Sequence, residues 1–175
     1  MKILFDNYCI RSFEENDVDS IVKYANNIEV SRYLRDSFPY PYSRENAIQW
    51  VSFVKNNYST LFFAIANDKE LIGGISAVPQ PDVHRFSAEV GFWIGQLFWN
   101  KGIMTKAIPA FCNYLFTKFN FNRLTSNVFD GNEASKKVLS RSGFILEGVL
   151  RKSVYKNDKF VDQFIYGLLK EDFQL

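Results

Sequence analysis

The chain has 175 residues and a mass of 20.4 kDa, with 47% hydrophobic and 23% charged residues. These values favour one compact domain, residues 1–175, with enough apolar surface for a core. The 21 basic and 19 acidic residues are mixed along the chain and give a formal net charge of only +2, which argues against a surface for nucleic acid or anionic membrane.

The cysteines and the histidine offer little for metal chemistry. Cys9 and Cys112 are far apart in apolar contexts, and His84 is the one histidine, so we expect no metal site and no Cys/His nucleophile pair. Both thiols are expected to be buried in a reducing compartment, and His84 to lie in a surface turn. Neither a signal peptide nor a run of about 20 apolar residues is present, so we expect a cytoplasmic protein.

The N-terminal part of the chain predicts a strand followed by two helices. Residues 8–13 alternate as a strand does, and the segment after them carries apolar residues at the helical spacing i, i+3, i+4, i+7. These are Val18, Ile21, Val22 and Ala25. Residues 35–43 are expected to form a loop, because two prolines separated by one tyrosine interrupt a helix. Ser43 then provides the N-cap of the second helix.

The central part predicts three strands in an antiparallel meander. The runs 61–67 and 71–79 are rich in apolar residues and are joined by an Asp-Lys-Glu turn, which indicates a hairpin. A third strand is expected over 87–95, after a turn-rich segment.

The C-terminal part predicts a crossover, a short helix and a final hairpin. The segment 102–119 places six apolar residues on one helical face, and 123–129 returns as a strand parallel to the strand before it. The six are Met104, Ala107, Ile108, Phe111, Leu115 and Phe119. Asn132 and Gly143 mark the start and end of a shorter helix. Residues 144–169 predict two strands around a Lys-Asn-Asp turn, which completes a mixed α/β arrangement.

The segment WNKGIMTKA, around Gly102, is the first candidate for a functional site. A helix that begins after Gly102 offers unpaired backbone N–H groups and the positive end of its dipole, and Lys101 adds a charge. The phosphate-loop pattern GxxxxGK(S/T) and the dinucleotide pattern GxGxxG are absent from the sequence, so neither an NTPase nor a dinucleotide fold is supported. Spacing alone leaves two alternatives, an anion site and an ordinary helix start.

Motifs over nearly the whole chain stand in one order: YPYSRENAIQWV, LIGGI, AEVGFWI, WNKGIMTKA, NEASKKVLSRSGFILEG and DQFIYGLL. Together they resemble the GNAT superfamily of acetyl-CoA-dependent N-acetyltransferases, and more narrowly its branch of ribosomal-protein N-terminal acetyltransferases. The resemblance implies a mixed α/β (α+β) fold, in which about four helices flank a central, mostly antiparallel twisted sheet with one splayed parallel strand pair.

The resemblance also implies a site for acetyl-CoA as co-substrate. Its pyrophosphate would be held by backbone N–H groups of Asn100, Lys101, Gly102, Ile103, Met104 and Thr105. The pantetheine arm would pair like an extra strand with the backbone of Phe92, Trp93 and Ile94, where the parallel strands splay. Asn132 and Ser135 would touch the cofactor farther along.

The chain departs from the family pattern at Trp99, Met104, Pro109 and Leu139. That pattern reads Gln or Arg, two residues, Gly, one residue, then Gly or Ala, where this chain has Trp99, Gly102 and Met104. The larger Met104 is expected to narrow the phosphate pocket. Pro109 lies inside the helix and is expected to bend it or to loosen its first turns. Many relatives have a tyrosine general acid at the position of Leu139.

N-acetyl transfer needs a neutral amine, a polarised carbonyl and a proton for the departing thiolate. Glu89, in an apolar strand, is the candidate base, directly or through a water; on an outward face it would be an ordinary solvated residue. Ser135 is the candidate acid, and the alternative is a bond to the cofactor or to its own helix. The loop aromatics either wall an acceptor pocket or pack as a surface loop; they are Phe38, Tyr40 and Tyr42.

The sequence therefore predicts an N-acetyltransferase for a primary amine, and favours the N-terminal α-amino group of a protein such as a ribosomal protein. A second enzyme hypothesis keeps acetyl-CoA and changes the acceptor to a polyamine, an aminoglycoside or an amino sugar. A third hypothesis is a CoA-binding module without catalysis, because the loop is incomplete and the tyrosine is missing. We expect no direct nucleic-acid or membrane partner, and 17% aromatic residues are compatible with a homodimer.

Overall fold

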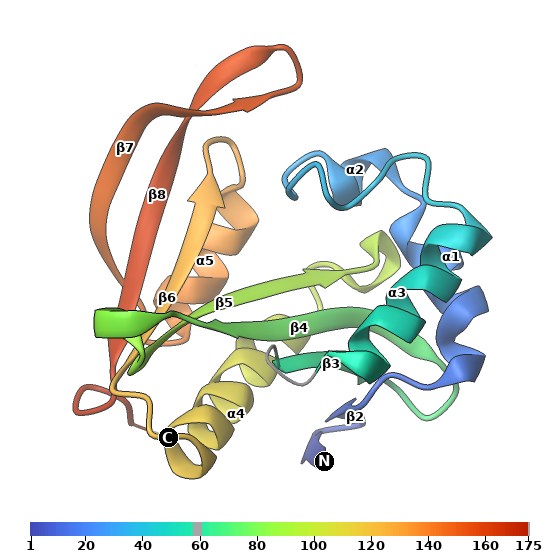
Figure 1. The fold of residues 1–175 in the computed structure, drawn as a ribbon, viewed down its shortest axis with the longest axis horizontal. Helices are drawn as coiled ribbons and strands as arrows, with labels where there is room; N and C mark the ends of the chain where they lie inside the picture. Colours follow the sequence, from blue (N-terminus) through green and yellow to red (C-terminus); the bar gives the residue numbers. More distant parts are fainter. Residues whose placement is uncertain (58–60, 175) are drawn as a thin grey trace. The chain divides into compact units, whose positions relative to one another are not determined.

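A computed structural model describes residues 1–57 and 61–174, and Figure 1 traces the chain. The chain divides into two compact units, each assembled from two stretches of sequence. The first unit is Met1–Ala77 with Phe92–Ile103, and the second is Val78–Gly91 with Met104–Leu175. The expectation of a single domain over residues 1–175 stays a prediction.

The first unit contains the N-terminal strands, the first helices and a hairpin. In chain order these are β1 (Lys2–Phe5), β2 (Tyr8–Arg11), η1 (Glu15–Asp17), α1 (Val18–Ala25), α2 (Ile28–Ser31), α3 (Arg44–Asn56), β3 (Leu61–Ala66), most of β4 (Leu71–Pro79), the end of β5 (Ser87–Ile94) and η3 (Gln96–Phe98). The antiparallel pairing of β3 with β4 confirms the predicted hairpin. The predicted first strand and the two predicted helices are confirmed as β2, α1 and α3.

The sequence patterns miss two short elements of this unit. Strand β1 pairs antiparallel with β2, and Asp6 in the turn between them has a positive φ of 44°. Helix α2 begins after Asn27, whose side chain accepts a hydrogen bond from the backbone N–H of Glu29. Each element is four residues long, which is too short to establish a periodicity.

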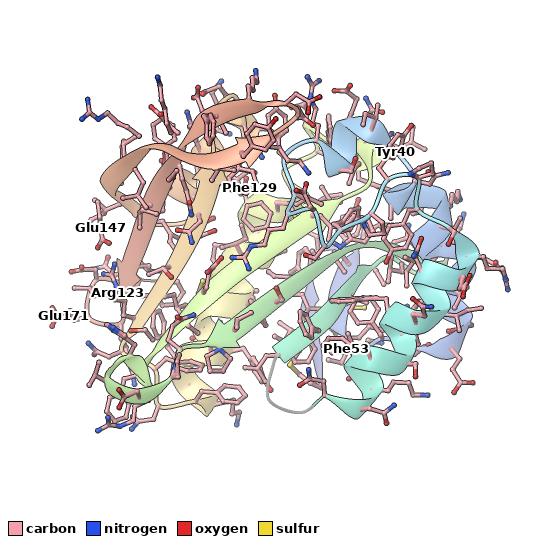
Figure 2. The ribbon with its side chains drawn as sticks, turned by 45° about the horizontal axis from the view of Figure 1, so that its top comes forward. Tyr40, Phe53, Arg123, Phe129, Glu147 and Glu171 are labelled. Carbon is pink, nitrogen blue, oxygen red and sulfur yellow. The ribbon has the colours of Figure 1, made fainter. Side chains whose placement is uncertain are left out.

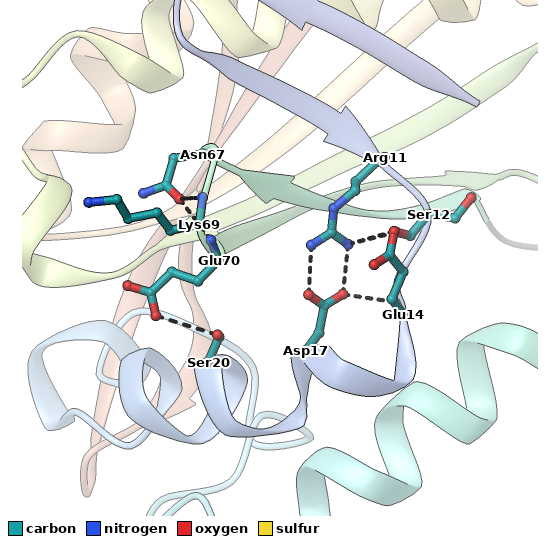
Figure 3. Close-up of polar contacts among 8 residues, drawn as sticks. All are labelled: Arg11, Ser12, Glu14, Asp17, Ser20, Asn67, Lys69 and Glu70. Carbon is teal, nitrogen blue, oxygen red and sulfur yellow. Dashed lines mark hydrogen bonds and ion pairs between the residues drawn. The ribbon is translucent and has the colours of Figure 1, made fainter.

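An ion pair joins the end of β2 to the start of α1, as Figure 3 shows. The guanidinium nitrogens Nη1 and Nη2 of Arg11 lie 2.8 and 2.7 Å from the two carboxylate oxygens of Asp17. The backbone N–H of Glu14 donates a further bond to this carboxylate. The hydrogen bond to Asp17 raises the pKa of Arg11, although burial opposes it. Because its charge is hydrogen-bonded on several sides, Asp17 tolerates burial and ties the segment before α1 to Arg11 at the end of β2.

Apolar residues of the helices and the hairpin form the core of the first unit. They are Phe13, Val18, Ile21, Ala25, Tyr42, Ala47, Val51, Ala64 and Leu71. The stripe predicted for the first helix is confirmed, because Val22 also packs against this cluster. Helix α3 begins after Ser43, whose hydroxyl oxygen accepts a hydrogen bond from the backbone N–H of Asn46 at 3.1 Å, which confirms the predicted cap.

The second unit contains the crossover helix and the C-terminal hairpin. Its elements are η2 (Asp82–His84), the first part of β5, α4 (Ile103–Lys118), β6 (Arg123–Phe129), α5 (Glu133–Arg141), β7 (Ile145–Lys156) and β8 (Lys159–Leu169). Strands β5 and β6 are parallel, and β8 is antiparallel to both β6 and β7. Along the sheet the strand order is β1-β2-β3-β4-β5-β6-β8-β7. This confirms the predicted mixed α/β fold with a mostly antiparallel sheet and one parallel pair.

Helix α4 continues through Pro109 to Lys118. The predicted apolar face is confirmed, since Met104, Ala107, Ile108, Phe111 and Leu115 are buried and Phe119 is half-buried. The side chain of Met104 is thus part of the core. Helix α5 begins after Asn132 and ends before Gly143, which has a positive φ of 88° as its predicted terminal role requires.

The cysteines and the histidine lie where the sequence predicts. Cys9 and Cys112 are free and buried, and burial raises the pKa of the Cys112 thiol to about 12. His84 is exposed at the end of η2. Among the described residues, no helix combines the length and the apolar character needed to cross a membrane.

Candidate active site

The loop before α4 has a left-handed backbone conformation that favours glycine at position 102. Gly102 has a φ of +72°, and a Cβ placed on it would meet no heavy atom within 4 Å. Asn100 is also left-handed, with a φ of 59°. Ile103, the first residue of α4, follows directly. The loop therefore turns into a helix N-terminus with open space beside its backbone, and this arrangement fits a phosphate group.

Contacts within the first unit hold the segment that leads to this loop. The indole Nε1 of Trp99 donates to the carbonyl oxygen of Ile94 at 2.9 Å. The ring of Phe98 meets the ring of Tyr24 edge-on, with centroids 5.2 Å apart. Gly95 lies against the same Tyr24 ring, and a Cβ there would come within 2.8 Å of it. Helix α1 thus supports both ends of η3.

Tyr24 is itself fixed by Glu70, in the turn before β4. Its hydroxyl donates to Glu70 Oε1 at 2.6 Å, and Lys23 Nζ lies 2.9 Å from the same oxygen. These bonds lower the pKa of Glu70. A chain of contacts therefore runs from the β3–β4 turn through Tyr24 to the segment before Gly102.

The predicted pantetheine strand, Phe92, Trp93 and Ile94, forms the end of β5. Two glycines of β4 allow Trp93 to lie close. A Cβ on Gly74 would come within 2.7 Å of the indole Nε1 of Trp93, and a Cβ on Gly73 would meet the Trp93 carbonyl oxygen and the Cα of Ile94. The LIGGI motif is therefore explained by the close approach of β4 to the end of β5.

We expect Gly73→Ala to lower the free energy of unfolding by about 2–4 kcal/mol, because the atoms that meet the new Cβ include rigid backbone. Gly148→Ala is the matched control, because a Cβ on Gly148 would meet no heavy atom within 4 Å. Its unfolding free energy should stay within about 0.5 kcal/mol of the wild type. Urea titrations of the three proteins measure both values, and equal midpoints would contradict the close approach.

The three aromatic residues predicted to wall the acceptor pocket differ in their exposure. The ring of Phe38 packs against Tyr42 and against Trp93, with centroids 5.1 and 5.5 Å apart. Tyr42 is 5% exposed, and burial raises its pKa to about 12. Tyr40 is 51% exposed. Phe38 and Tyr42 are thus packed, with Phe38 in contact with Trp93 of the predicted cofactor strand, whereas Tyr40 faces solvent.

In the second unit, Glu89 lies at the end of the parallel ladder between β5 and β6. The ladder pairs Ser87–Glu89 with Arg123–Thr125. One residue later, the hydroxyl of Ser126 donates to the carbonyl oxygen of Val90 at 2.9 Å. Glu89 is half-buried and points to the face opposite the buried side chain of Val90.

Asn132 and Ser135 lie at the start of α5. The side-chain oxygen of Asn132 accepts a hydrogen bond from the backbone N–H of Ser135 at 3.2 Å, so the predicted cap is confirmed. The ammonium of Lys136 lies 3.6 Å from the ring centroid of Phe164, which places α5 over the face that carries this ring. The register puts Phe164 opposite the Glu89 face, so Glu89 and Ser135 belong to opposite sides of the sheet.

Several polar residues that the sequence does not single out share a side of the sheet with Glu89. We call this the Glu89 face; it comprises Glu89, Arg123, Thr125, Asn127, Phe129, Gln163, Ile165, Ile145 and Leu150. Arg123 and Phe129 mark the two ends of β6 on it, and Glu147 lies beside Arg123 (Figure 2). In RLTSNVF the residues of this face alternate with Leu124, Ser126 and Val128, which are buried; two of these three are apolar, so the sequence carries a partial signal of the alternation.

Comparison with known proteins identifies the family of the chain. Residues 7–145 match the model of the acetyltransferase (GNAT) domain. The uncharacterized N-acetyltransferase YoaA of Bacillus subtilis is 28% identical over 94% of each chain. The putative ribosomal N-acetyltransferase YdaF of the same species is 37% identical over 61% of this chain and 58% of its own. The structure of RimL, a ribosomal α-N-protein acetyltransferase in complex with coenzyme A, superposes with a TM-score of 0.85 at 21% identity, covering 97% of this chain and 98% of RimL.

Proposed function

The chain belongs to the GNAT acetyltransferase family and is an N-acetyltransferase, and on that premise we propose that it transfers the acetyl group of acetyl-CoA to the α-amino group of a protein N-terminus. The observation that carries the proposal is the loop at Gly102. Gly102 has a left-handed backbone, α4 begins at the next residue, and the space beside Gly102 is unfilled. Such a loop suits the pyrophosphate of a CoA thioester.

Six consecutive residues of this segment are proposed to hold the pyrophosphate through their backbone N–H groups. They are Asn100, Lys101, Gly102, Ile103, Met104 and Thr105. The backbone of Phe92, Trp93 and Ile94 is proposed to pair with the pantetheine arm, and Asn132 and Ser135 to touch the cofactor. The burial of Met104 supports the proposed pyrophosphate site. Because its side chain points into the core, it does not cover the backbone N–H groups at the start of α4.

We assign the proton transfers to residues of the second unit. Glu89 would accept a proton from the acceptor ammonium, directly or through a water, and so make the amine nucleophilic. The hydroxyl of Ser135 would donate a hydrogen bond to the departing thiolate and relay to it a proton taken up from solvent water, so that the serine stays neutral. Tyr40 is proposed as the loop residue that meets the acceptor, with Phe38 and Tyr42 holding the loop in place.

The similarity to a putative ribosomal N-acetyltransferase supports a protein N-terminus, and specifically a ribosomal protein, as the acceptor. A cytoplasmic location and a homodimer stay predictions.

A panel of amines tests the proposed acceptor. The purified protein and acetyl-CoA are incubated with a peptide that has a free N-terminus, the same peptide with a blocked N-terminus and an internal lysine, spermidine, and an aminoglycoside. We expect the free peptide to react faster than every other amine by on the order of tenfold or more, measured as thiol release and as acetylated peptide by mass spectrometry. Faster transfer to spermidine or to the aminoglycoside would overturn the acceptor, and acetyl-CoA binding without any transfer would overturn the enzyme assignment.

A further inference from the structure

The Glu89 face carries a row of side chains leading away from Glu89. Glu89 is paired with Thr125 of β6, and Asn127 and Phe129 follow on the same side at intervals of two residues. Phe129 is paired with Gln163 of β8, so Gln163 points to this face as well. The order along the face is therefore carboxylate, hydroxyl and then two carboxamides.

The two carboxamides have no side-chain partner in the described part of the chain. Asn127 and Gln163 are half-buried, and within residues 1–57 and 61–174 neither side chain makes a hydrogen bond. Their backbone groups belong to strands paired in register. A carboxamide both donates and accepts, as a peptide group does, so each can pair with the backbone of a bound chain.

The face carries little uncompensated negative charge for a polyamine. Glu147 reaches across Gly167, and Arg123 Nη1 lies 2.7 Å from its carboxylate oxygen Oε1. In the described parts of β5 to β8, the register places one further carboxylate on this face, that of Glu89. A polyamine carries several ammonium groups and requires several carboxylates, whereas a peptide N-terminus carries one ammonium.

We propose that this face binds the acceptor as an extended peptide, with the carboxamides of Asn127 and Gln163 pairing with its backbone and its terminal amine toward Glu89. This inference rests on the N-acetyltransferase function proposed above and narrows its acceptor to a peptide chain several residues long. The apolar residues Phe129, Ile165 and Leu150 flank the carboxamides and accommodate the peptide's side chains.

The spacing of the carboxamides fits an extended backbone. Asn127 is paired with Ile165, so Gln163 is its diagonal neighbour on the next strand. Diagonal neighbours lie about 7–8 Å apart. An extended chain rises about 3.3 Å per residue, so peptide groups on one of its edges recur at about 6.6 Å. One peptide can therefore engage both carboxamides with groups two residues apart.

Steady-state kinetics with acceptors of increasing length test this inference. The acceptors are a single amino-acid amide, a dipeptide amide and a tetrapeptide amide that share one N-terminal residue, together with spermidine. For the wild type, KM should fall by about 10- to 100-fold from the single amide to the tetrapeptide. Asn127→Ala and Gln163→Ala should each raise the tetrapeptide KM by about 3- to 10-fold, while kcat, the KM for acetyl-CoA and the KM for the single amide stay unchanged.

Two further variants keep the result interpretable. Asn127→Asp retains the size of the side chain but removes its donors, and should also raise the tetrapeptide KM. Asn120→Ala makes the same truncation at an exposed position before β6, and should match the wild type. A wild-type KM independent of acceptor length, or variants that leave it unchanged, would overturn the peptide face while transfer itself stands. Failure of the wild type to acetylate any acceptor would overturn the proposed function and this inference together.

Discussion

Gly102→Asp should raise the dissociation constant for acetyl-CoA by about 100-fold or more, which corresponds to about 2.8 kcal/mol. The new carboxylate would stand in the open space beside the loop, where it would repel a pyrophosphate and crowd the backbone donors. Aspartate is among the residues that tolerate the left-handed region, so the fold should survive the change. Isothermal titration calorimetry of the wild type and the variant measures the difference.

Gly102→Ala separates charge from backbone strain. Alanine at a φ of +72° costs about 1–2 kcal/mol but adds no charge, and nothing within 4 Å would meet its Cβ. This strain weakens binding only as far as the free loop relaxes and binding has to restore the left-handed conformation, so the dissociation constant should rise by at most about 5- to 30-fold. If the two variants bind acetyl-CoA equally well, the loop does not hold the pyrophosphate. If the folded wild type does not bind acetyl-CoA at all, the cofactor site itself is wrong.

The elements around Gly102 could be predicted because their signals are local. A glycine followed by a long apolar stripe predicts a helix that begins after it, and α4 begins at Ile103. Ser43 and Asn132 were predicted as caps for the same reason, since a cap is a contact across three residues. The hairpin turn at Asn157 and Asp158, both with positive φ, is likewise encoded in adjacent residues.

Contacts between distant segments could not be predicted from such signals. Gly73 and Gly74 stand out in the sequence because glycine is unfavourable inside a strand. They are explained only by the close approach of Trp93, about twenty residues later. The support that Tyr24 gives to Gly95 is of the same kind, because no periodicity links α1 to the segment after β5.

The candidate site shows the same limit. Glu89 was noticed because a carboxylate is unusual in an apolar strand, whereas Asn127 and Gln163 are ordinary residues in their own strands. They share a face only through the register of β6 with β8, which pairs Phe129 with Gln163. A one-residue shift of that register would place Gln163 on the opposite side of the sheet. Alternation within each strand gives the two possible faces, and the pairing decides which residues meet.

Glu89→Gln should lower kcat/KM for a peptide acceptor by about 100-fold at pH 7, with the dissociation constant for acetyl-CoA unchanged within about twofold. Glutamine keeps the size of the side chain but cannot accept the proton of the acceptor ammonium. An α-amino group has a pKa of about 8, so at pH 7 most of the acceptor is protonated and depends on a base. The loss in kcat/KM should therefore shrink as the pH rises above about 8, because most of the acceptor amine is then already neutral and needs no base.

The control for this variant is Glu171→Gln, the same substitution at an exposed position in the turn after β8, labelled in Figure 2. It should keep the wild-type rate at every pH, which excludes a general effect of removing one negative charge. Thermal unfolding of both variants shows whether they fold as the wild type does. A Glu89→Gln deficit that is the same at pH 7 and at pH 9 would assign Glu89 to positioning the acceptor, since a residue that only orients the amine matters equally in both protonation regimes. A deficit that disappears with pH would leave proton transfer as its role, and would place the acceptor amine on the Glu89 side of the sheet.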